Sequence, residues 1–172
     1  CAANANSTTY PGSQTVVGSA VVAENELTLV ASRLPDSSFG YFLASRTQGF
    51  VPNAGGSAGN LCLGGTVGRF TAQIFNTGMT GSAAVPVNLS AFPTPTGSVA
   101  VQPGEPWHFQ AWHRDSSGGS PTSNFTDAVS VAFSLSRRVS APRVSRQRRA
   151  TAACPHPGGL RGTTPSASRG CV

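Results

Sequence analysis

Lysine is absent from this 172-residue sequence, in which all 12 basic residues are arginine. Charged residues of both signs make up only 10% of the chain. No stretch approaches the roughly 20 consecutive apolar residues that a membrane-spanning helix requires, so insertion into a bilayer is not expected. No Gly-X-Y period runs through the 20 glycines, which excludes a collagen-like chain. Apolar residues nowhere recur at helical spacing over three turns, so the sequence predicts almost no helix.

The distribution of charge divides the chain at about Ser136. Residues 1–136 hold all six acidic residues and four arginines, which leaves a net charge of −2. Residues 137–172 hold the other eight arginines, no acidic residue and no aromatic residue. The larger aliphatic residues of this segment are only Val139, Val144, Leu160 and Val172. Burying so few apolar side chains cannot offset the ~1–2 kcal/mol of backbone entropy that each ordered residue costs. We therefore predict a folded domain over 1–136 and a disordered Arg-rich tail over 137–172.

Two interpretations of the Arg-rich tail are open. The arginines clustered between Arg137 and Arg149 could neutralise several phosphates of a nucleic acid. However, no aromatic residue lies among them for base stacking, no lysine accompanies them, and an exported domain rarely meets DNA. Arg, Ala, Pro, Gly, Ser and Thr with a few cysteines are also what out-of-frame reading of GC-rich DNA produces. We favour a frameshift or read-through product and expect no nucleic-acid partner.

The four cysteines are Cys1, Cys62, Cys154 and Cys171. None forms a CxxC pair, and the three histidines are not spaced as zinc partners, so a structural zinc site is not expected. Cys1 and Cys62 could form a disulfide, which would close a loop of about 60 residues and be worth about 4 kcal/mol. Two unpaired thiols are the alternative. The start at Cys1 indicates a removed leader or a fragment of something longer, and the low Lys and abundant Ser, Thr, Asn and Gly suit a secreted, extracellular protein.

Short alternating segments predict strands throughout the folded part. Leu27, Leu29 and Ala31 alternate with more polar neighbours, as expected of a strand with one buried face. Turn signals rich in Gly, Pro, Asn and Asp recur every 8–12 residues, so about eight or nine strands are expected. The fold class is therefore all-β, an antiparallel β-sandwich of jelly-roll or Greek-key-like form.

Three finer expectations follow from the same pattern. Pro86 places the segment 85–89 at a sheet edge, since proline cannot donate to a strand ladder. Residues 67–75 alternate over their whole length and predict one continuous strand. The predicted core consists of Leu27, Leu29, Phe42, Leu61, Phe70, Ile74, Leu89, Val101, Trp107, Phe109, Val129, Val131 and Phe133.

Several segments together resemble a known kind of domain. They include Leu27-Thr28-Leu29, Asn60-Leu61-Cys62-Leu63-Gly64-Gly65, Gln102-Pro103-Gly104-Glu105, the run Trp-His-Phe-Gln-Ala-Trp-His-Arg-Asp over 107–115, and Ser-Asn-Phe-Thr-Asp-Ala over 123–128. The combination resembles a β-rich domain that recurs, usually near the C-terminus, in large exported bacterial proteins of unassigned function. The resemblance covers about residues 1–134 and brings no known activity with it.

This resemblance bears on the cysteines and the histidines. In that family an N-terminal Cys before Asn-Ser-Thr accompanies the Cys of Leu-Cys-Leu-Gly-Gly, so the resemblance implies that Cys1 pairs with Cys62. His108 and His113 stand where the family usually has Asn and Tyr. Neither histidine is therefore expected to carry a shared catalytic role.

A catalytic group is the first of three possibilities for chemistry. His113 and Asp115 project to one face of their predicted strand and His108 to the other, so a His–Asp couple is conceivable but a triad is not. The nucleophile motif Gly-x-Ser-x-Gly is absent, as are paired carboxylates at catalytic spacing. We favour the interpretation that these residues belong to strand surface and core, and we expect no catalytic residues and no enzyme.

A cation site is the second possibility. Asp115, Asn124 and Asp127 flank the Ser/Gly-rich stretch 116–123, which is expected to be a loop, and oxygen side chains around a loop suit Ca²⁺. We favour the alternative that Asp115 pairs with an arginine while Asn124 and Asp127 cap turns. No metal or other cofactor is therefore expected.

A ligand site is the third possibility. The aromatic residues that could be exposed are Tyr41, Trp107, Trp112 and Phe125, and aromatic faces beside polar side chains are how sandwich modules hold sugars. At least two of the aromatic residues in the run Trp107, Phe109 and Trp112 must nevertheless be buried. The candidate ligand-binding residues are Trp112, Arg114 and Asp115.

The sequence thus favours one function and leaves an alternative. The favoured function is that of a non-catalytic extracellular β-sandwich module, structural or adhesive, within a larger secreted protein. The alternative is a carbohydrate-binding module. The partners to be considered are glycans or other cell-surface proteins.

Overall fold

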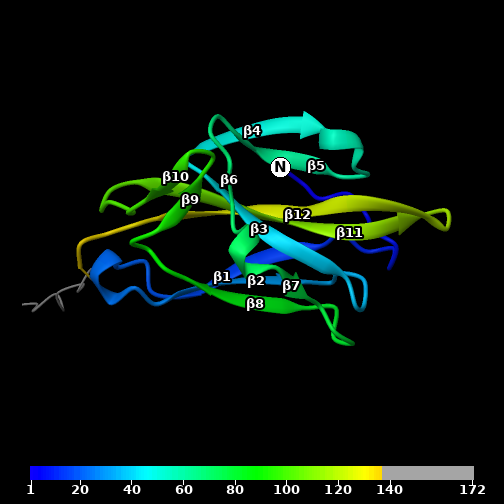
Figure 1. Cartoon of the computed structure of the whole chain (residues 1–172), viewed down its shortest axis with the longest axis horizontal. Coiled ribbons are helices and arrows are strands. Elements are labelled where there is room, and N and C mark those ends of the chain that lie inside the picture. Colours follow the sequence, from blue (N-terminus) through cyan, green and yellow to red (C-terminus); the bar gives the residue numbers. More distant parts are fainter. Residues whose placement is uncertain (137–172) are drawn as a thin grey trace, which may run out of the picture. The chain divides into compact units, whose positions relative to one another are not determined.

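The computed structural model describes residues 1–136, which form an antiparallel β-sandwich (Figure 1). Twelve strands and three short 3-10 helices make up this part of the chain, and it contains no α-helix. The expected all-β sandwich is therefore confirmed. The expectations about a disordered tail and a frameshift fall on residues 137–172 and lie outside the described residues.

One layer of the sandwich is a three-stranded antiparallel sheet. Its strands are β1 (Ser13–Gly18), β2 (Leu27–Ser32) and β8 (Ala83–Val87), in the order β1-β2-β8. The inward positions of β2 are Leu27, Leu29 and Ala31, as the alternation predicted. Strand β8 is an edge strand, as expected from Pro86, which pairs with Thr28 on β2.

The other layer is a five-stranded sheet. It has the order β12 (Ser120–Ala132), β11 (Pro106–Ser117), β3 (Phe39–Ser45) and β6 (Gly68–Arg69), and β7 (Phe75–Asn76) also pairs with β3. The chain passes between the two sheets from β2 to β3 and again from β7 to β8. Four of the eight strand pairings in the described part of the chain therefore join strands that are not consecutive in the sequence, as in Greek-key sandwiches.

Two ribbons and three 3-10 helices complete the fold. The ribbons are β4 (Thr47–Pro52) with β5 (Asn60–Gly64), and β9 (Phe92–Thr94) with β10 (Gly97–Val99). The 3-10 helices are η1 (Val22–Glu24), η2 (Ala54–Gly56) and η3 (Thr71–Gln73). Strands β1, β4 and β9 lie where the sequence predicted no strand.

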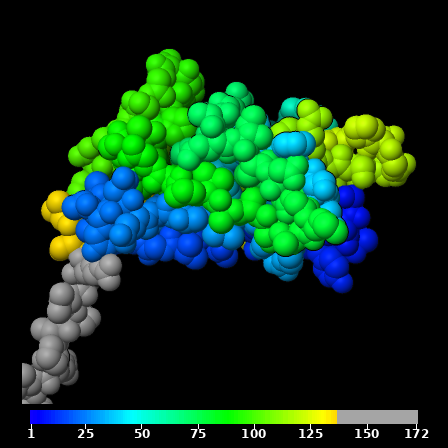
Figure 2. All heavy atoms as spheres, turned by 60° about the horizontal axis from the view of Figure 1, so that its bottom comes forward, coloured from blue at the N-terminus to red at the C-terminus, as the bar shows by residue number. Residues whose placement is uncertain are grey.

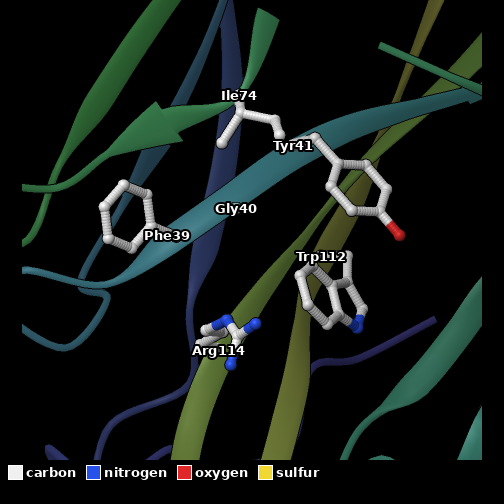
Figure 3. Close-up of a pocket in the computed structure, with 6 residues that line it drawn as sticks. All are labelled: Phe39, Gly40, Tyr41, Ile74, Trp112 and Arg114. Carbon is white, nitrogen blue, oxygen red and sulfur yellow. The ribbon is translucent and has the colours of Figure 1, made fainter. Parts of the chain in front are cut away.

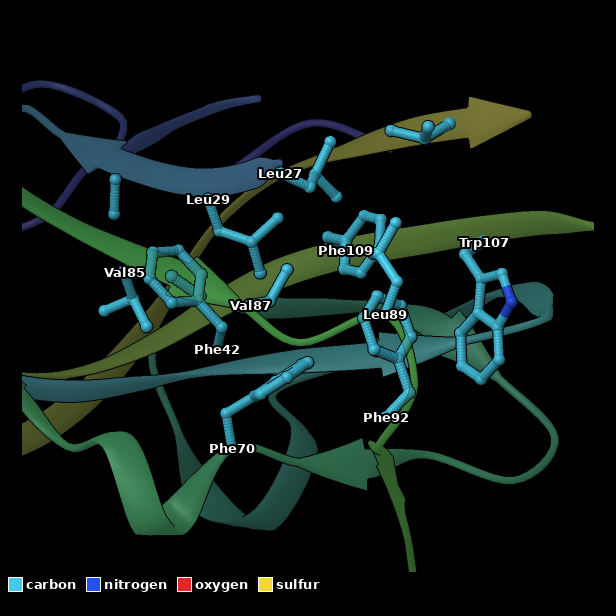
Figure 4. Close-up of a cluster of buried hydrophobic side chains, with 14 of the residues drawn as sticks. Leu27, Leu29, Phe42, Phe70, Val85, Val87, Leu89, Phe92, Trp107 and Phe109 are labelled. Atoms are coloured by element: carbon cyan, nitrogen blue, oxygen red, sulfur yellow. The ribbon is translucent and has the colours of Figure 1, made fainter. Parts of the chain in front are cut away.

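The main core lies between the two sheets (Figure 4). Phe92, fully buried, is at its centre and makes edge-to-face contacts with other aromatic rings. Those rings belong to Phe70, Trp107, Phe109 and Phe133, with ring centroids 4.9–6.2 Å from that of Phe92. Ten of the expected core residues are buried, namely Leu27, Leu29, Phe42, Phe70, Leu89, Val101, Trp107, Phe109, Val131 and Phe133.

The other three expected core residues differ. Ile74 is 61% exposed, so its assignment to the core was wrong. The continuous strand expected over 67–75 is also wrong, because the chain leaves β6 at Phe70 (ψ 53°), forms η3, and resumes pairing only at β7. After Phe70 the alternation in the sequence therefore no longer indicates which side chains are buried. Val129 is half-buried against the core, and Leu61 is half-buried in a second cluster.

This second cluster covers the outer face of the five-stranded sheet, the face turned away from the main core. Its buried residues are Leu43, Leu63 and Phe125. Cys62, next to Leu63 on β5, forms a disulfide with Cys1, with Cα atoms 5.5 Å apart. The expected pairing is thus confirmed, and the N-terminus lies beside β5 (Figure 1).

Strands β11 and β12 form a long hairpin whose tip projects from one end of the described residues (Figure 2). The stretch 116–123, expected to be a loop, is strand except for a two-residue turn at Gly118 and Gly119. Both glycines have positive φ, 57° and 83°, which suits the tight turn of a two-residue hairpin. The expectation of a longer loop was wrong because the serines pair across the hairpin.

Candidate ligand-binding site on the outer sheet face

Two aromatic side chains lie side by side on the outer face of the five-stranded sheet. Tyr41 on β3 and Trp112 on β11 are direct partners in the antiparallel register. Their neighbours Phe42 and Ala111 point into the main core, so alternation turns Tyr41 and Trp112 outward. The two rings stack, with centroids 5.0 Å apart and planes at 27°. Cross-strand aromatic pairs of this kind hold both rings in place.

A hollow of about 630 Å³ opens beside this pair (Figure 3). Besides Tyr41 and Trp112 it is lined by Phe39, Gly40, Ile74 and Arg114. Phe39 and Ile74 are 53% and 61% exposed, so apolar surface borders the hollow on the solvent side. Gly40 is tightly enclosed, since a Cβ atom there would collide with the Phe75 ring and the Trp112 carbonyl oxygen.

A second hollow, of about 450 Å³, also uses the aromatic pair. Its other lining residues come from the second cluster and from the segments around it, and they are Leu43, Ala54, Gly55, Leu61, Val67, Arg69, Ser123 and Phe125. Tyr41 and Trp112 therefore border both hollows. Both volumes fall within the range of ~300–1,000 Å³ that is usual for small-molecule sites.

Each hollow contains one arginine and no carboxylate. Arg114 lines the first hollow and Arg69 the second. Both side chains are exposed, and neither forms an ion pair with another residue of the described part. The aromatic pair is thus flanked by two uncompensated positive charges.

The third candidate ligand-binding residue, Asp115, lies outside both hollows. Its Oδ1 accepts hydrogen bonds from the backbone N–H groups of Ser7 (2.9 Å) and Ser116 (2.8 Å), and its Oδ2 accepts one from Nδ2 of Asn124 (3.1 Å). Burial raises the pKa of a carboxyl group, but these hydrogen bonds outweigh it and hold the pKa of Asp115 below its ordinary value. Asp115 therefore anchors the N-terminal segment rather than joining Trp112 and Arg114. Within residues 1–136 Asp115 forms no ion pair with an arginine, so the favoured pairing is wrong for this part of the chain.

The three candidate cation ligands do not converge. Asn124 lies next to Asp115, but Asp127 lies elsewhere and accepts a hydrogen bond from the N–H of Gln14 (2.6 Å). Asn124 is fully buried and also donates to the carbonyl oxygen of Ala5 (3.1 Å), so it fastens the N-terminal segment instead of capping a turn. Within residues 1–136 no group of three His, Cys, Asp or Glu side chains is placed to hold a metal ion.

His108 and His113 line neither hollow. His113 is fully buried, and its Nδ1 donates to the carbonyl oxygen of Arg114 (3.0 Å) rather than to Asp115. Its Nε2 is buried without a partner in the part of the chain that the structure describes, and burial lowers the pKa of His113. His108 is 8% exposed, its Nδ1 lies 2.6 Å from Oγ of Ser130, and burial also lowers its pKa.

Two of the four aromatic residues that could be exposed are in fact buried. Trp107 is 3% exposed and lies in the main core, beneath the guanidinium group of Arg46 at 4.9 Å from the ring centroid. Phe125 is 5% exposed in the second cluster. Their assignment to an exposed set was wrong, because they pack into the centres of the two clusters, whereas Tyr41 and Trp112 are only half-buried. Sequence reasoning missed Phe39, Arg69 and Ile74, which reach the site through strand pairing and through the chain reversal after β6.

No protein-family model, curated protein or solved structure matches this chain. The resemblance noted in the sequence therefore stays an expectation. Among the described residues, no helix has both the length and the apolar character needed to cross a membrane.

Proposed function

We propose that residues 1–136 form a non-catalytic module of a larger secreted protein, and that this module adheres to a partner through the surface around Tyr41 and Trp112. The disulfide between Cys1 and Cys62 supports an oxidising, extracellular location, because such bonds persist outside the reducing cytosol. The hollows beside the aromatic pair support binding, since they combine apolar walls with a few polar groups.

The stacked pair of Tyr41 and Trp112 is the observation that carries this proposal. Cross-strand pairing holds the rings in place, so a ligand meets them without a large loss of side-chain entropy. Because the rings are only half-buried and lie between two hollows, part of their surface is available to a ligand.

The alternative from the sequence, carbohydrate binding, is the form of adhesion that these side chains favour. Sugar rings present C–H faces that pack on aromatic rings, and their hydroxyl groups hydrogen-bond to arginine. Trp112 supplies the largest ring at the site, and Arg69 and Arg114 supply donors on either side. We therefore propose saccharides on a cell or matrix surface as the partner.

Titration of the full chain with a panel of soluble polysaccharides, followed by tryptophan fluorescence and calorimetry, tests this function. We expect quenching by at least one polysaccharide, and a loss of about tenfold or more in its affinity for Trp112→Ala, the change that ~1.4 kcal/mol of lost stacking produces. Phe50→Ala is the matched control, because Phe50 is 62% exposed on β4 and lines neither hollow.

Two results would contradict the proposal. A flat titration across the whole panel would leave a structural module without this adhesive surface. Equal affinities of the Trp112→Ala variant and the wild type would place the binding surface elsewhere on the chain.

A further inference from the structure

The charge of the two hollows is opposite to that of the described part as a whole. Residues 1–136 contain six acidic residues and four arginines, so they carry a net charge of −2. One of the four arginines, Arg46, is neutralised by Glu105 at 3.0 Å. Of the other three, Arg69 and Arg114 line the hollows, and no acidic residue does. Positive charge is therefore concentrated beside the aromatic pair of an otherwise mildly acidic domain.

The two arginines lie on opposite sides of the aromatic pair along the strands. Arg114 is two residues beyond Trp112 on β11, and therefore on the same face. Arg69 is paired with Leu43, two residues beyond Tyr41 on β3. Because β3 and β11 are antiparallel, these two displacements point in opposite directions. At ~3.4 Å per residue, the two positions lie about 14 Å apart along the strands, with the rings between them.

We propose that this surface binds an anionic polysaccharide, with carboxylates on its sugar units meeting Arg69 and Arg114 while a sugar ring between them packs on Tyr41 and Trp112. This inference rests on the proposed function and names the class of saccharide. The guanidinium group presents two parallel N–H donors that match a carboxylate, and such bonds are about twice as strong as neutral ones. The separation of the arginines requires a ligand of several sugar units rather than a monosaccharide.

The negative charge of the ligand is the property that this surface should recognise. A neutral polysaccharide leaves both guanidinium groups without a counter-charge, whereas a polyuronate supplies one at each end of the aromatic pair. Apolar side chains beside the arginines offer packing surface for the sugar ring that joins two carboxylate-bearing units. Phe39 and Ile74 in the first hollow and Leu61 in the second are among these side chains.

The test compares polygalacturonate with its fully methyl-esterified form, which keeps the sugar backbone but removes the charge. Dextran sulfate tests whether a sulfate group serves in place of a carboxylate, and unmodified dextran is its neutral counterpart. Affinities of the full chain are measured by calorimetry at two salt concentrations. The variants are Arg69→Gln, Arg114→Gln and the double variant, with Arg33→Gln as the matched control, because Arg33 is exposed and lines neither hollow.

We expect the wild type to prefer polygalacturonate over its methyl ester. Each of the two single variants should lose about tenfold in affinity for the acid form, as expected for one charge-assisted hydrogen bond. The double variant should lose the part of the preference for acid over ester that Arg69 and Arg114 supply, whereas Arg33→Gln should behave as wild type. All variants retain the arginines of residues 137–172, so attraction of polyanions to those arginines is the same in each and cancels from the comparison.

The outcomes separate this inference from the proposed function. Equal binding of acid and ester by the wild type, with Trp112→Ala still losing affinity, would overturn the anionic preference and leave saccharide binding intact. An undiminished affinity of the double variant for polygalacturonate would also overturn it. If dextran sulfate binds more tightly than polygalacturonate, and this affinity depends on Arg69 and Arg114, the anionic group of the ligand is a sulfate rather than a carboxylate. Binding to none of these polymers or of the wider panel would overturn the proposed function itself.

Discussion

The buried side chain of Gln110 holds the backbone of Cys62, and so fixes the disulfide-bearing strand β5 against the five-stranded sheet. Oε1 of Gln110 accepts the N–H of Cys62 at 2.8 Å. Its Nε2 donates to the carbonyl oxygens of Asn60 (2.9 Å) and Thr126 (2.6 Å). Gln110 is fully buried, so one amide satisfies buried backbone groups of Cys62 on β5 and Thr126 on β12 and a partly buried one of Asn60.

Replacement of Gln110 by leucine should lower the free energy of unfolding by about 3 kcal/mol, because it leaves a buried N–H, a buried carbonyl and a partly buried carbonyl without these partners. Urea unfolding followed by fluorescence measures the change. Gln102→Leu, at an exposed glutamine, is the control and should stay within about 0.5 kcal/mol of wild type. Equal stability of the two variants would show that the Gln110 amide does not hold β5.

The disulfide between Cys1 and Cys62 should contribute about 4 kcal/mol, since it closes a loop with a sequence separation of 61 residues. The double variant Cys1→Ser, Cys62→Ser should therefore unfold at a lower urea concentration than wild type. Reduced wild type should unfold together with the double variant. A midpoint that reductant does not shift, or a non-reducing peptide map without the Cys1–Cys62 link, would contradict this prediction.

Two substitutions of Gly118, at the tip of the β11–β12 hairpin, should differ in their effect on the stability of the domain. Its φ of 57° is left-handed, and no atom lies within 4 Å of a Cβ built there, so only the backbone conformation decides the outcome. Gly118→Val should destabilise the domain by about 1–2 kcal/mol, whereas Gly118→Asn should change stability little, because asparagine tolerates this conformation. Unfolding midpoints that fall equally for both substitutions would contradict the assigned turn.

Acidification should destabilise the domain through His113. Burial lowers its pKa from the ordinary value of 6.5, so below that pH the unfolded chain binds a proton that the native protein excludes. The stability that the neutral ring contributes is complete above pH 6.5 and is lost as the pH falls below it. The hydrogen bond to the Arg114 carbonyl and the nearby carboxylate of Asp115 oppose this lowering of the pKa but do not reverse it.

Urea midpoints measured between pH 5 and pH 8 test this dependence. His113→Asn should flatten the profile most, since asparagine keeps a donor near the Arg114 carbonyl and cannot titrate there. His108→Asn is the matched comparison. The pKa of His108 is lowered in the same direction, but His108 lies nearer the surface, so its removal should have the smaller effect. An unchanged slope in the His113→Asn variant would contradict the prediction.

Local patterning predicted the elements of this fold whose burial follows a simple period. The inward face of β2 and the edge position of Pro86 follow from side-chain alternation and from a missing N–H group, which depend only on neighbouring residues. Ile74 shows where such reasoning ends. Its place in an alternating run was clear, but the chain turns away after Phe70 and carries Ile74 to the surface.

The candidate site was predictable only in part. Trp112 and Arg114 share a face because they are two residues apart on one strand, and the sequence shows this directly. The contributions of Tyr41 and Arg69 depend on how β3 pairs with β11 and with β6, which no local pattern reveals. Asp115 lies outside the site because its carboxylate is hydrogen-bonded to Ser7, which is distant from it in the sequence, and to Asn124.

The sequence by itself determined the fold class, the boundary of charge near Ser136 and which residues of each regular strand share a face, because composition and period are local properties of the chain. Tertiary structure alone decided which strands lie side by side, which aromatic rings stay half exposed, and where positive charge gathers in a domain with a net charge of −2. The physical reason is that the register between distant strands is set by the packing of two whole sheets, so no single segment contains it.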